Sequence, residues 1–390
     1  MKKKIIILGS TGSIGTNTLK IIQKYKKNFE VLVLSAYKNI DKLLKQAKKF
    51  SCKNVIIPNN NISVFTKKKF EDSGIKIYDS FESIRLITKK KKIYYAMVAI
   101  SGIYGLKPSL ILSNYTKNLA IVNKESLVSG WNLIKKNIKK NKVNFVPIDS
   151  EHYSIFTLLR NHSINEIERI YITASGGPFI NYNKKDYNKI TIKKALRHPN
   201  WKMGKKISID SSTMMNKVFE VIEAKNIFNI PYNKISILTH PKSYIHAIIK
   251  FKNGLIKIAA HNPDMKIPIF NSIFNNQNSI KNPKSINLNK LNNLNLKNIN
   301  IKQFPLVSIL NDMPNKNSLY ETALIIINDF FVDQFLKKKI NYLQLINSIK
   351  KISNLEEFKR LKKKPANNIN KIFKLMNYVS LKINSLGIYK

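Results

Sequence analysis

The sequence contains little cysteine, little acid and no long apolar run, and each shortage excludes a class of protein. Cys52 is the single cysteine in 390 residues. A disulfide scaffold and a cysteine zinc site are therefore excluded, and a reducing compartment is favoured. No apolar run approaches the ~20 residues that span a bilayer. The run that follows Lys4 stops at Gly9, short of the ~7–15 residues of a signal-peptide core. We expect a cytoplasmic protein with no membrane partner.

The basic charge is large, but it consists almost entirely of lysine. The chain has 69 Lys and Arg against 22 Asp and Glu, a net charge of +47, yet only five of the basic residues are Arg. Base and phosphate recognition favours the planar Arg fork, and no nucleic-acid-binding motif occurs. Lys, Asn and Ile are enriched along the whole chain, as codon drift in an AT-rich genome produces. We expect no specific nucleic-acid partner, although weak polyanion binding stays open.

Rare residues mark where chemistry is to be sought. Eight of the 12 Gly fall in four short stretches, and all six His lie between His152 and His261. At ~150 residues per domain, the length predicts two or three domains.

Residues 1–148 alternate short β-branched runs with amphipathic stretches, which predicts a Rossmann-like, doubly wound parallel sheet. Residues 149–274 have a mixed pattern typical of an α+β catalytic domain. Residues 275–303 are an Asn/Lys-rich linker, and residues 304–390 form a helical C-terminal domain. The strands are expected at residues 4–8, 29–35, 54–57, 75–78, 94–100, 119–122, 144–147, 167–174, 235–239 and 245–251. The clearest helices are expected at 14–25, 40–50, 212–228, 321–336 and 342–352.

A glycine-rich turn follows the first strand. Gly9, Gly12 and Gly15 stand where a Rossmann turn brings backbone N–H groups and a helix N-terminus to a pyrophosphate. The second strand ends in Ser35-Ala36-Tyr37-Lys38-Asn39, without the acid that binds the ribose of NAD. This favours NADPH, with Lys38 at its 2′-phosphate; the alternative is that Lys38 is one more surface lysine.

Two acids follow the last strand of the first domain. Asp149 and Glu151 lie at the carboxyl end of a strand, and Glu220 and Glu223 lie one helical turn apart further on. Carboxylates with open water positions suit Mg²⁺ or Mn²⁺. A solvated loop end is the alternative for the first two acids.

A second glycine turn, Ser175-Gly176-Gly177-Pro178, also follows a strand. It either presents N–H groups to an anion or is an ordinary tight turn. The segment from His198 to Gly204 contains Pro199 and Trp201, which predicts a loop; either it closes over substrate, or Trp201 packs in the core.

Together these motifs resemble the 1-deoxy-D-xylulose-5-phosphate reductoisomerase family, in order and spacing, from residue 4 to about 270. The matching segments are residues 9–15, 123–126, 149–152, 175–179, 197–204, 210–217 with Glu220 and Glu223, and 240–243 with His246.

The resemblance implies an enzyme of the non-mevalonate isoprenoid pathway. It converts 1-deoxy-D-xylulose 5-phosphate to 2-C-methyl-D-erythritol 4-phosphate with NADPH, and a divalent cation chelates substrate oxygens. The family also implies a homodimer.

The resemblance further implies residue roles. The metal ligands are Asp149, Glu151 and Glu220, and the catalytic residues are Lys124, Glu151 and Asp149. The substrate contacts are Lys124, Ser150, Glu151, Ser175, His198, Ser211, Asn216, Lys217 and Glu220. The NADPH contacts are Thr11, Gly12, Ser13, Ile14, Lys38, Asn39, Asn123, Glu125 and Gly204.

Three positions depart from the family pattern: Tyr37, His261 and Asp329. The alternatives are a dehydrogenase with a nucleophilic cysteine, a nucleic-acid-binding protein and an inactive reductoisomerase. Cys52 precedes a strand of the nucleotide domain, which disfavours the first alternative.

Overall fold

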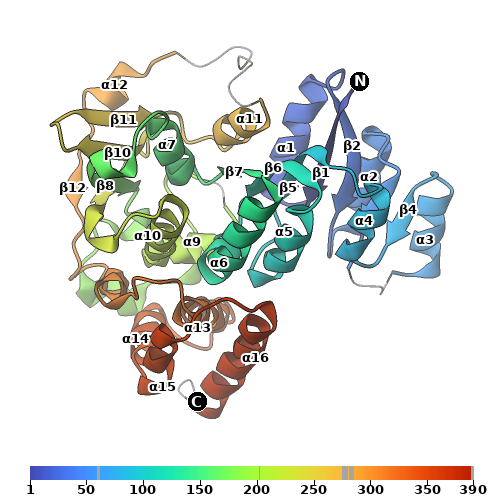
Figure 1. Ribbon diagram of the computed structural model, residues 1–390. Coiled ribbons are helices and arrows are strands. Elements are labelled where there is room, and N and C mark those ends of the chain that lie inside the picture. The colour runs from blue at the N-terminus through green and yellow to red at the C-terminus, as the bar shows by residue number, and fades with distance from the viewer. Residues whose placement is uncertain (59–61, 202, 275–279, 281–284, 388–390) are drawn as a thin grey trace. The chain divides into compact units, whose positions relative to one another are not determined.

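The computed structural model of the protein describes residues 1–58, 62–201, 203–274, 280 and 285–387. The chain divides into two compact units (Figure 1). Unit 1 comprises Met1–Leu127, Leu133–Asp149 and Met265–Pro283. Unit 2 comprises Val128–Asn132, Ser150–Asp264 and Lys284–Lys390.

Unit 1 is built on a parallel sheet of seven strands in the order β4-β3-β2-β1-β5-β6-β7. The predicted doubly wound sheet is confirmed. Ile5, Ile6 and Ile7 of the central β1 are completely buried, because helices cover both faces of the sheet. The strands are β1 (Lys3–Leu8), β2 (Phe29–Ser35), β3 (Asn54–Ile56), β4 (Lys76–Tyr78), β5 (Ile93–Val98), β6 (Thr116–Ile121) and β7 (Asn144–Pro147).

The helices of unit 1 alternate with these strands. They are α1 (Ser13–Lys24), α2 (Ile40–Lys49), α3 (Val64–Glu71), α4 (Ile84–Ile87), α5 (Leu106–Leu112), α6 (Lys124–Asn141) and the 3₁₀ turns η1 (Phe81–Ser83) and η2 (Ile103–Gly105). Strand order reverses at β1, which lies between β2 and β5. The carboxyl end of β1 is therefore the topological switch point, where open α/β sheets bind ligands.

The helix α11 (Lys266–Phe274) belongs to unit 1 and not to the unit of the predicted catalytic domain. Phe274 packs edge-on against Phe29, with ring centroids 5.4 Å apart, and its ring lies 4.7 Å from that of Tyr25. The hydroxyl of Tyr95 is 2.8 Å from that of Ser272. Figure 1 shows α11 beside α1. α11 follows strands of unit 2 in the sequence, yet its aromatic side chains pack in unit 1. No local sequence pattern predicts this packing.

Unit 2 contains a five-stranded sheet in the order β11-β10-β8-β9-β12. The strands are β8 (Ile167–Ala174), β9 (Ile235–Thr239), β10 (Ile245–Phe251), β11 (Ile256–Ala260) and β12 (Lys297–Asn298). The first three were expected and are confirmed. The two edge strands, β11 and β12, were not expected. β12 lies inside the expected linker and pairs with β9, Lys297 opposite Thr239. Residues 275–279 and 281–284 of that linker lie outside the described residues.

The helix expected over 212–228 is α10 (Met215–Phe228), which begins slightly later than expected, and a separate helix that was not expected, α9 (Lys205–Ser212), precedes it. Met214 stands between them with φ of +65°, in the left-handed region. A single non-glycine residue in that conformation ends one helix and begins the next, and hydrophobic periodicity does not reveal it. Around the sheet lie α7 (Ser150–Leu158), α8 (Ile192–Ala195), η3 (Ile164–Glu166), η4 (Gly177–Phe179), η5 (Lys184–Lys189) and η6 (Tyr232–Lys234).

The C-terminal part of unit 2 is helical, as expected. Its elements are α12 (Leu288–Leu291), η7 (Pro305–Asp312), α13 (Leu319–Leu336), α14 (Tyr342–Ser353), α15 (Glu356–Lys359), η8 (Arg360–Lys363) and α16 (Ile369–Ser385). Ser318 and Glu321 form a capping box at the start of α13. Burial raises the pKa of Glu321 to about 7.

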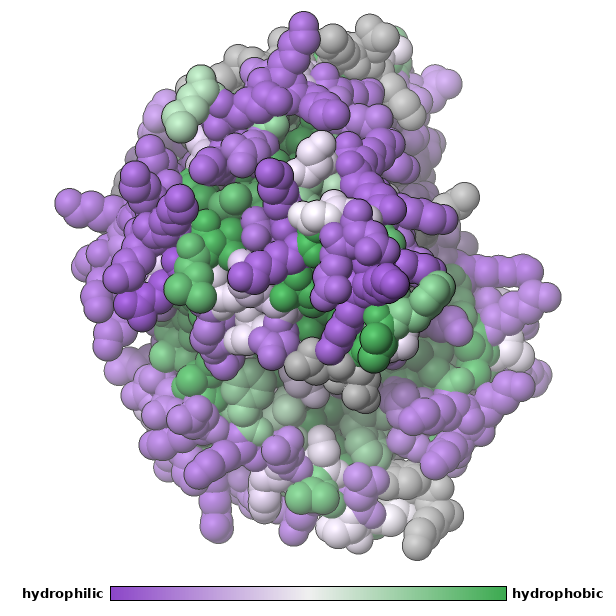
Figure 2. All heavy atoms as spheres, turned by 90° about the vertical axis from the view of Figure 1, so that its right-hand side faces the viewer, coloured by the Kyte–Doolittle hydropathy of each residue, from purple (hydrophilic) through white to green (hydrophobic). Residues whose placement is uncertain are grey.

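Hydrophilic side chains dominate one face of the molecule. Figure 2 shows one face covered mostly by hydrophilic side chains, with hydrophobic atoms in small areas between them. In the described part of the chain, no helix combines the length and the apolar character needed to cross a bilayer.

The packing of α11 in unit 1 predicts a stability effect. Ile273 is completely buried in the unit 1 core. Ile273→Ala should therefore lower the free energy of unfolding by ~2–5 kcal/mol, measured by urea denaturation. The control is Leu381→Ala on α16, because Leu381 is 70% exposed and should change stability by less than ~0.5 kcal/mol. Equal unfolding midpoints for the two variants would contradict the assignment of α11 to this core.

Candidate active site

The turn after β1 has the geometry of a dinucleotide-binding loop. Gly9 has φ of +77°, and a Cβ at this position would lie 2.4 Å from the backbone oxygen of Ala99. A Cβ at Gly15 would lie 2.5 Å from the backbone oxygen of Gly9. Both positions therefore require glycine. Gly12 is the N-cap of α1, so the free N–H groups of the first helical turn point out of this loop, where a pyrophosphate binds.

Side chains of α2 hold this loop, and sequence analysis did not identify them. The Lys42 ammonium donates to the backbone oxygen of Thr11 at 2.7 Å. Gln46 donates to the backbone oxygen of Ser10 at 3.0 Å and accepts from its hydroxyl at 2.8 Å. The spacing of four residues on one helix face was the available signal.

The end of β2 has the composition expected of an NADP site. Lys38 and Asn39 are exposed, and the Asn39 side chain caps α2 by accepting from the backbone N–H of Lys42. Tyr37, one of the departures from the family, is 60% exposed and so takes no part in the core. In this segment no carboxylate stands where NAD requires one.

The other expected NADPH contacts occupy helix N-termini. Asn123 precedes α6 and donates to the Gly102 backbone oxygen at 2.6 Å, which ties the β6–α6 connection to the turn after β5. Glu125 lies in the first turn of α6. Gly204 caps α9 in unit 2. Thr11, Ser13 and Ile14 lie in the glycine loop and at the start of α1.

Three of the carboxylates singled out in the sequence lie close together. Asp149, Glu151 and Glu220 each offer one oxygen, and these oxygens lie within 4.8 Å of one another. Asp149 follows β7, Glu151 lies in the first turn of α7, and Glu220 lies in the middle of α10. Carboxylate oxygens are the ligands that Mg²⁺ and Mn²⁺ prefer, so these three residues could hold such an ion.

Two buried lysines neutralise these carboxylates. The Lys124 ammonium pairs with Asp149, and the Lys217 ammonium pairs with Glu220 and, at 3.1 Å, with Glu151. Lys124 and Lys217 are only 8% and 5% exposed. Like charges held this close in a partly buried place require cations, so the donor set and its charge fit a divalent ion.

A further acid, Glu223, lies on α10 one turn after Glu220. Glu223 is completely buried one turn beyond Glu220, and one of its oxygens lies 3.9 Å from Nδ1 of His152. Nε2 of His152 contacts the backbone oxygen of Glu220 at 2.8 Å. His152 thus links α7, which carries Glu151, to α10.

The turn after β8 binds His198, and the hydrogen bonds fix the tautomer of that ring. Nδ1 of His198 accepts from the backbone N–H groups of Asn200 and Trp201, at 3.1 and 3.0 Å. The ring proton therefore lies on Nε2, which donates to the Ser175 hydroxyl oxygen at 3.0 Å. That oxygen also accepts from the N–H of Gly177 at 3.1 Å. With both lone pairs used, Ser175 has its own proton left to donate to an anion.

Burial, together with the nearby Lys217 ammonium, lowers the pKa of His198 to about 4. The ring is therefore neutral near pH 7. Lys217 thus acts electrostatically both on the carboxylates and on the Ser175 side of the site. The structure places its ammonium on Glu151 and Glu220, and Asn216 likewise donates to Glu220. Ser211 lies at the end of α9, next to the glycine turn.

The segment from His198 to Gly204 is a loop in its described residues, which confirms the loop prediction; Lys202 lies outside them. Asn200 donates to the backbone oxygen of Pro241 at 2.6 Å and to the Ser243 hydroxyl at 2.8 Å. Trp201 is half-buried and meets His246 edge-on at 6.3 Å. The loop is thus anchored at its root, and its tryptophan is not part of a core.

The remaining departures from the family pattern have partners in unit 2. His261 stacks on His246, with ring centroids 3.8 Å apart. Asp329 pairs with Lys206 at 2.9 Å. Cys52 is buried, and burial raises the pKa of its thiol to about 11, so it is no nucleophile.

A dinucleotide loop without the NAD acid, together with a carboxylate centre and an anion-binding turn, defines an NADP-dependent oxidoreductase acting on a phosphorylated substrate. Family models agree with this class. The model described as 1-deoxy-D-xylulose 5-phosphate reductoisomerase matches residues 5–130, and its C-terminal domain matches 145–228. The model described as DXP reductoisomerase C-terminal domain matches 261–379. The chain belongs to the 1-deoxy-D-xylulose 5-phosphate reductoisomerase family and is an enzyme of that class.

Known reductoisomerases match this chain over nearly its whole length. The reductoisomerase of Pelagibacter ubique is 51% identical over 387 residues, 99% of this chain and 100% of the relative. That of Sulfurihydrogenibium is 38% identical and covers 91% of each chain. The Zymomonas mobilis enzyme, solved with NADPH, has a TM-score of 0.86 at 28% identity over 99% of each chain. A reductoisomerase solved with NADPH, fosmidomycin and magnesium has a TM-score of 0.90 at 27% identity, covering 99% of this chain and 98% of that one.

The buried His198 ring predicts an unusual titration. The folded chain binds fewer protons than the unfolded chain between the ordinary pKa of 6.5 and about 4, so the stability from this neutral ring is full above pH 6.5 and is lost as pH falls through that window. Nitrogen-15 NMR of the histidine rings should show an Nε2-protonated tautomer with a midpoint of about 4, the signal being assigned by its absence from His198→Gln. A midpoint near 6.5 would show that the ring is solvated.

Proposed function

We propose that Asp149, Glu151 and Glu220 hold the divalent cation with which this enzyme converts 1-deoxy-D-xylulose 5-phosphate to 2-C-methyl-D-erythritol 4-phosphate. The observation that carries this role is the convergence of their oxygens within 4.8 Å, balanced by two lysines. The cofactors of the enzyme are NADPH and Mg²⁺ or Mn²⁺. When bound, the cation polarises adjacent substrate oxygens and NADPH supplies a hydride.

The chain's own residues orient the substrate around these groups. Lys124 leaves Asp149 to donate to the substrate carbonyl oxygen, where negative charge develops during rearrangement. The Ser150 hydroxyl, 2.5 Å from Glu151, turns to a substrate hydroxyl. Because Lys124 and the carboxylates are buried or half-buried, little water competes for these contacts.

Unit 2 supplies the phosphate contacts. Ser175 donates its remaining proton to the phosphate, with Ser211, Asn216 and Lys217 as further donors. His198 orients Ser175, and the loop carrying Trp201 closes over the carbon skeleton and excludes water. Fosmidomycin is bound in a reductoisomerase 27% identical to this chain, and we expect it at the same contacts here.

Unit 1 supplies the NADPH contacts. The loop Thr11–Ile14 receives the pyrophosphate, and Lys38 with Asn39 meets the 2′-phosphate. Asn123, which precedes α6, and Glu125 in its first turn complete the contacts from this unit, and Gly204 of unit 2 is a further contact in the same proposal. A homodimer and a cytoplasmic location belong to the same proposal, and the single reduced Cys52 supports the second.

The metal role is tested by Glu151→Gln. Removing one charged ligand should lower kcat by at least ~10²-fold at saturating Mn²⁺, while the dissociation constant of NADPH, followed by fluorescence, stays the same. Glu168→Gln is the matched control, since Glu168 pairs with Lys250 on the surface. Near wild-type turnover in Glu151→Gln would remove this residue from the metal site.

The lid role is tested by Trp201→Ala. Because Trp201 is half-buried in a loop, KM should rise and kcat should fall while the melting temperature barely moves. Trp131, 6% exposed, is the contrast: Trp131→Ala should cost the ~3–5 kcal/mol of a truncated core tryptophan. A similar loss of stability in Trp201→Ala would make Trp201 a packing residue and rule out the lid.

A further inference from the structure

The proposed phosphate site has two walls in close contact. One wall is the turn Ser175–Gly177 after β8, and the other is the end of α9, at Ser211 and Ser212. Gly177 has φ of +64°, and a Cβ there would lie 2.9 Å from the backbone oxygen of Ser211. No side chain fits between the walls, so the distance between the two serine hydroxyls depends on how each wall is held.

Tyr342, at the start of α14, contacts both walls. Its hydroxyl donates to the backbone oxygen of Ser212 at 2.7 Å. Its ring meets the edge of Phe179, which follows the glycine turn, at 5.2 Å between centroids. Tyr342 is only 1% exposed. The carbonyl of Ser212 lies in the last turn of α9, where a helix leaves carbonyls without internal partners, and Tyr342 supplies that partner.

A second residue from the C-terminal helices holds α9 on the other side of Ser211. Asn328 of α13 donates to the buried carboxylate of Asp210 at 2.8 Å. Lys206 joins Asp210, at 3.3 Å, to Asp329 of α13. The residues immediately before and after Ser211 are thus each bonded to a different C-terminal helix.

We propose that Tyr342 and Asn328 are positioning residues for the phosphate group of the substrate. They fix Ser211 against the Ser175 turn, so that both hydroxyls meet one phosphate. Charge-assisted hydrogen bonds to a phosphate weaken steeply with distance and angle, so a small shift of α9 costs affinity. This inference rests on the phosphate role proposed for Ser175 and Ser211.

The first test is Tyr342→Phe, which removes one hydroxyl and keeps the ring. Loss of one hydrogen bond should raise KM for 1-deoxy-D-xylulose 5-phosphate and Ki for fosmidomycin together by ~3–10-fold. The dissociation constants of NADPH and Mn²⁺ should not change, because Tyr342 bonds the carboxyl end of α9, whereas Gly204 is at its amino end and the three carboxylates lie on other elements. Tyr320→Phe is the matched control: it removes a buried hydroxyl that donates to the Ser353 backbone oxygen at 3.3 Å, away from the site. Equal KM shifts in both variants, or none in Tyr342→Phe, would overturn the proposal.

A double-variant cycle shows whether Tyr342 acts through Ser211. In Ser211→Ala the hydroxyl being positioned is gone, so adding Tyr342→Phe should raise KM much less than it does alone. If the KM increases of the two single variants multiply in the double variant, the positioning role is wrong. The single variants separate this inference from the function beneath it. If Ser175→Ala and Ser211→Ala leave KM unchanged, the phosphate site itself is wrong; if they raise KM and Tyr342→Phe does not, only the positioning role fails.

Discussion

Repulsion among three acids is the constraint on which this site depends. Asp149, Glu151 and Glu220 hold oxygens within 4.8 Å of one another in a partly buried place, where like charges repel more strongly than in water. The chain offsets this with Lys124 and Lys217, in a protein otherwise rich in surface lysine. Under the proposed metal role, a divalent cation would take over this neutralisation and leave the two ammonium groups to the substrate.

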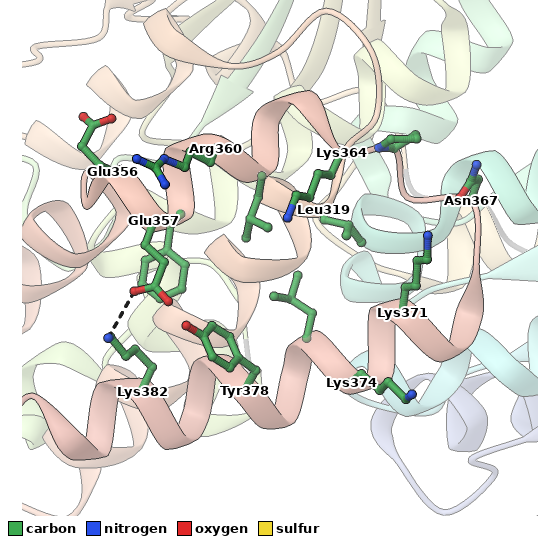
Figure 3. A pocket seen from close by; sticks show the side chains of 14 residues that line it. Leu319, Glu356, Glu357, Arg360, Lys364, Asn367, Lys371, Lys374, Tyr378 and Lys382 are labelled. Atoms are coloured by element: carbon green, nitrogen blue, oxygen red, sulfur yellow. Dashed lines mark ion pairs between the residues drawn. The ribbon is translucent and has the colours of Figure 1, made fainter.

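Support for the reacting groups comes from elements that never touch substrate. His152 joins the helix of Glu151 to that of Glu220, and α13 and α14 hold the end of α9. One groove lies among α15, η8 and α16, where Lys382 pairs with Glu357 (Figure 3), and none of the expected site residues lines it. The C-terminal helices α13 and α14 therefore reach the proposed phosphate site through their hydrogen bonds to α9.

Prediction of strands and helices from the sequence was correct where a short sequence pattern specifies the element. Strands β1, β2 and β7–β10 matched their expected ranges to within a residue, because continuous β-branched runs bounded by turn residues specify buried strands. Such prediction failed at Met214, whose left-handed backbone separates α10 from the unexpected α9, and at β12, two residues long in a segment without periodicity. β12 depends on a neighbour distant in sequence, because it pairs with the edge of β9.

The sequence alone indicated the candidate site residues. Glycines at positions of positive φ and acids after strand ends can be recognised from residue type and position, without knowledge of their tertiary contacts. Gly9, Asp149 and Glu151 are of this kind. Only the tertiary structure decided which partners complete them: Lys217 on the carboxylates, the His198 tautomer that frees the Ser175 proton, and Tyr342 under α9. These are hydrogen bonds and ion pairs between segments far apart in the chain, and such contacts leave no periodic trace in the sequence, because they depend on packing and not on local backbone preference.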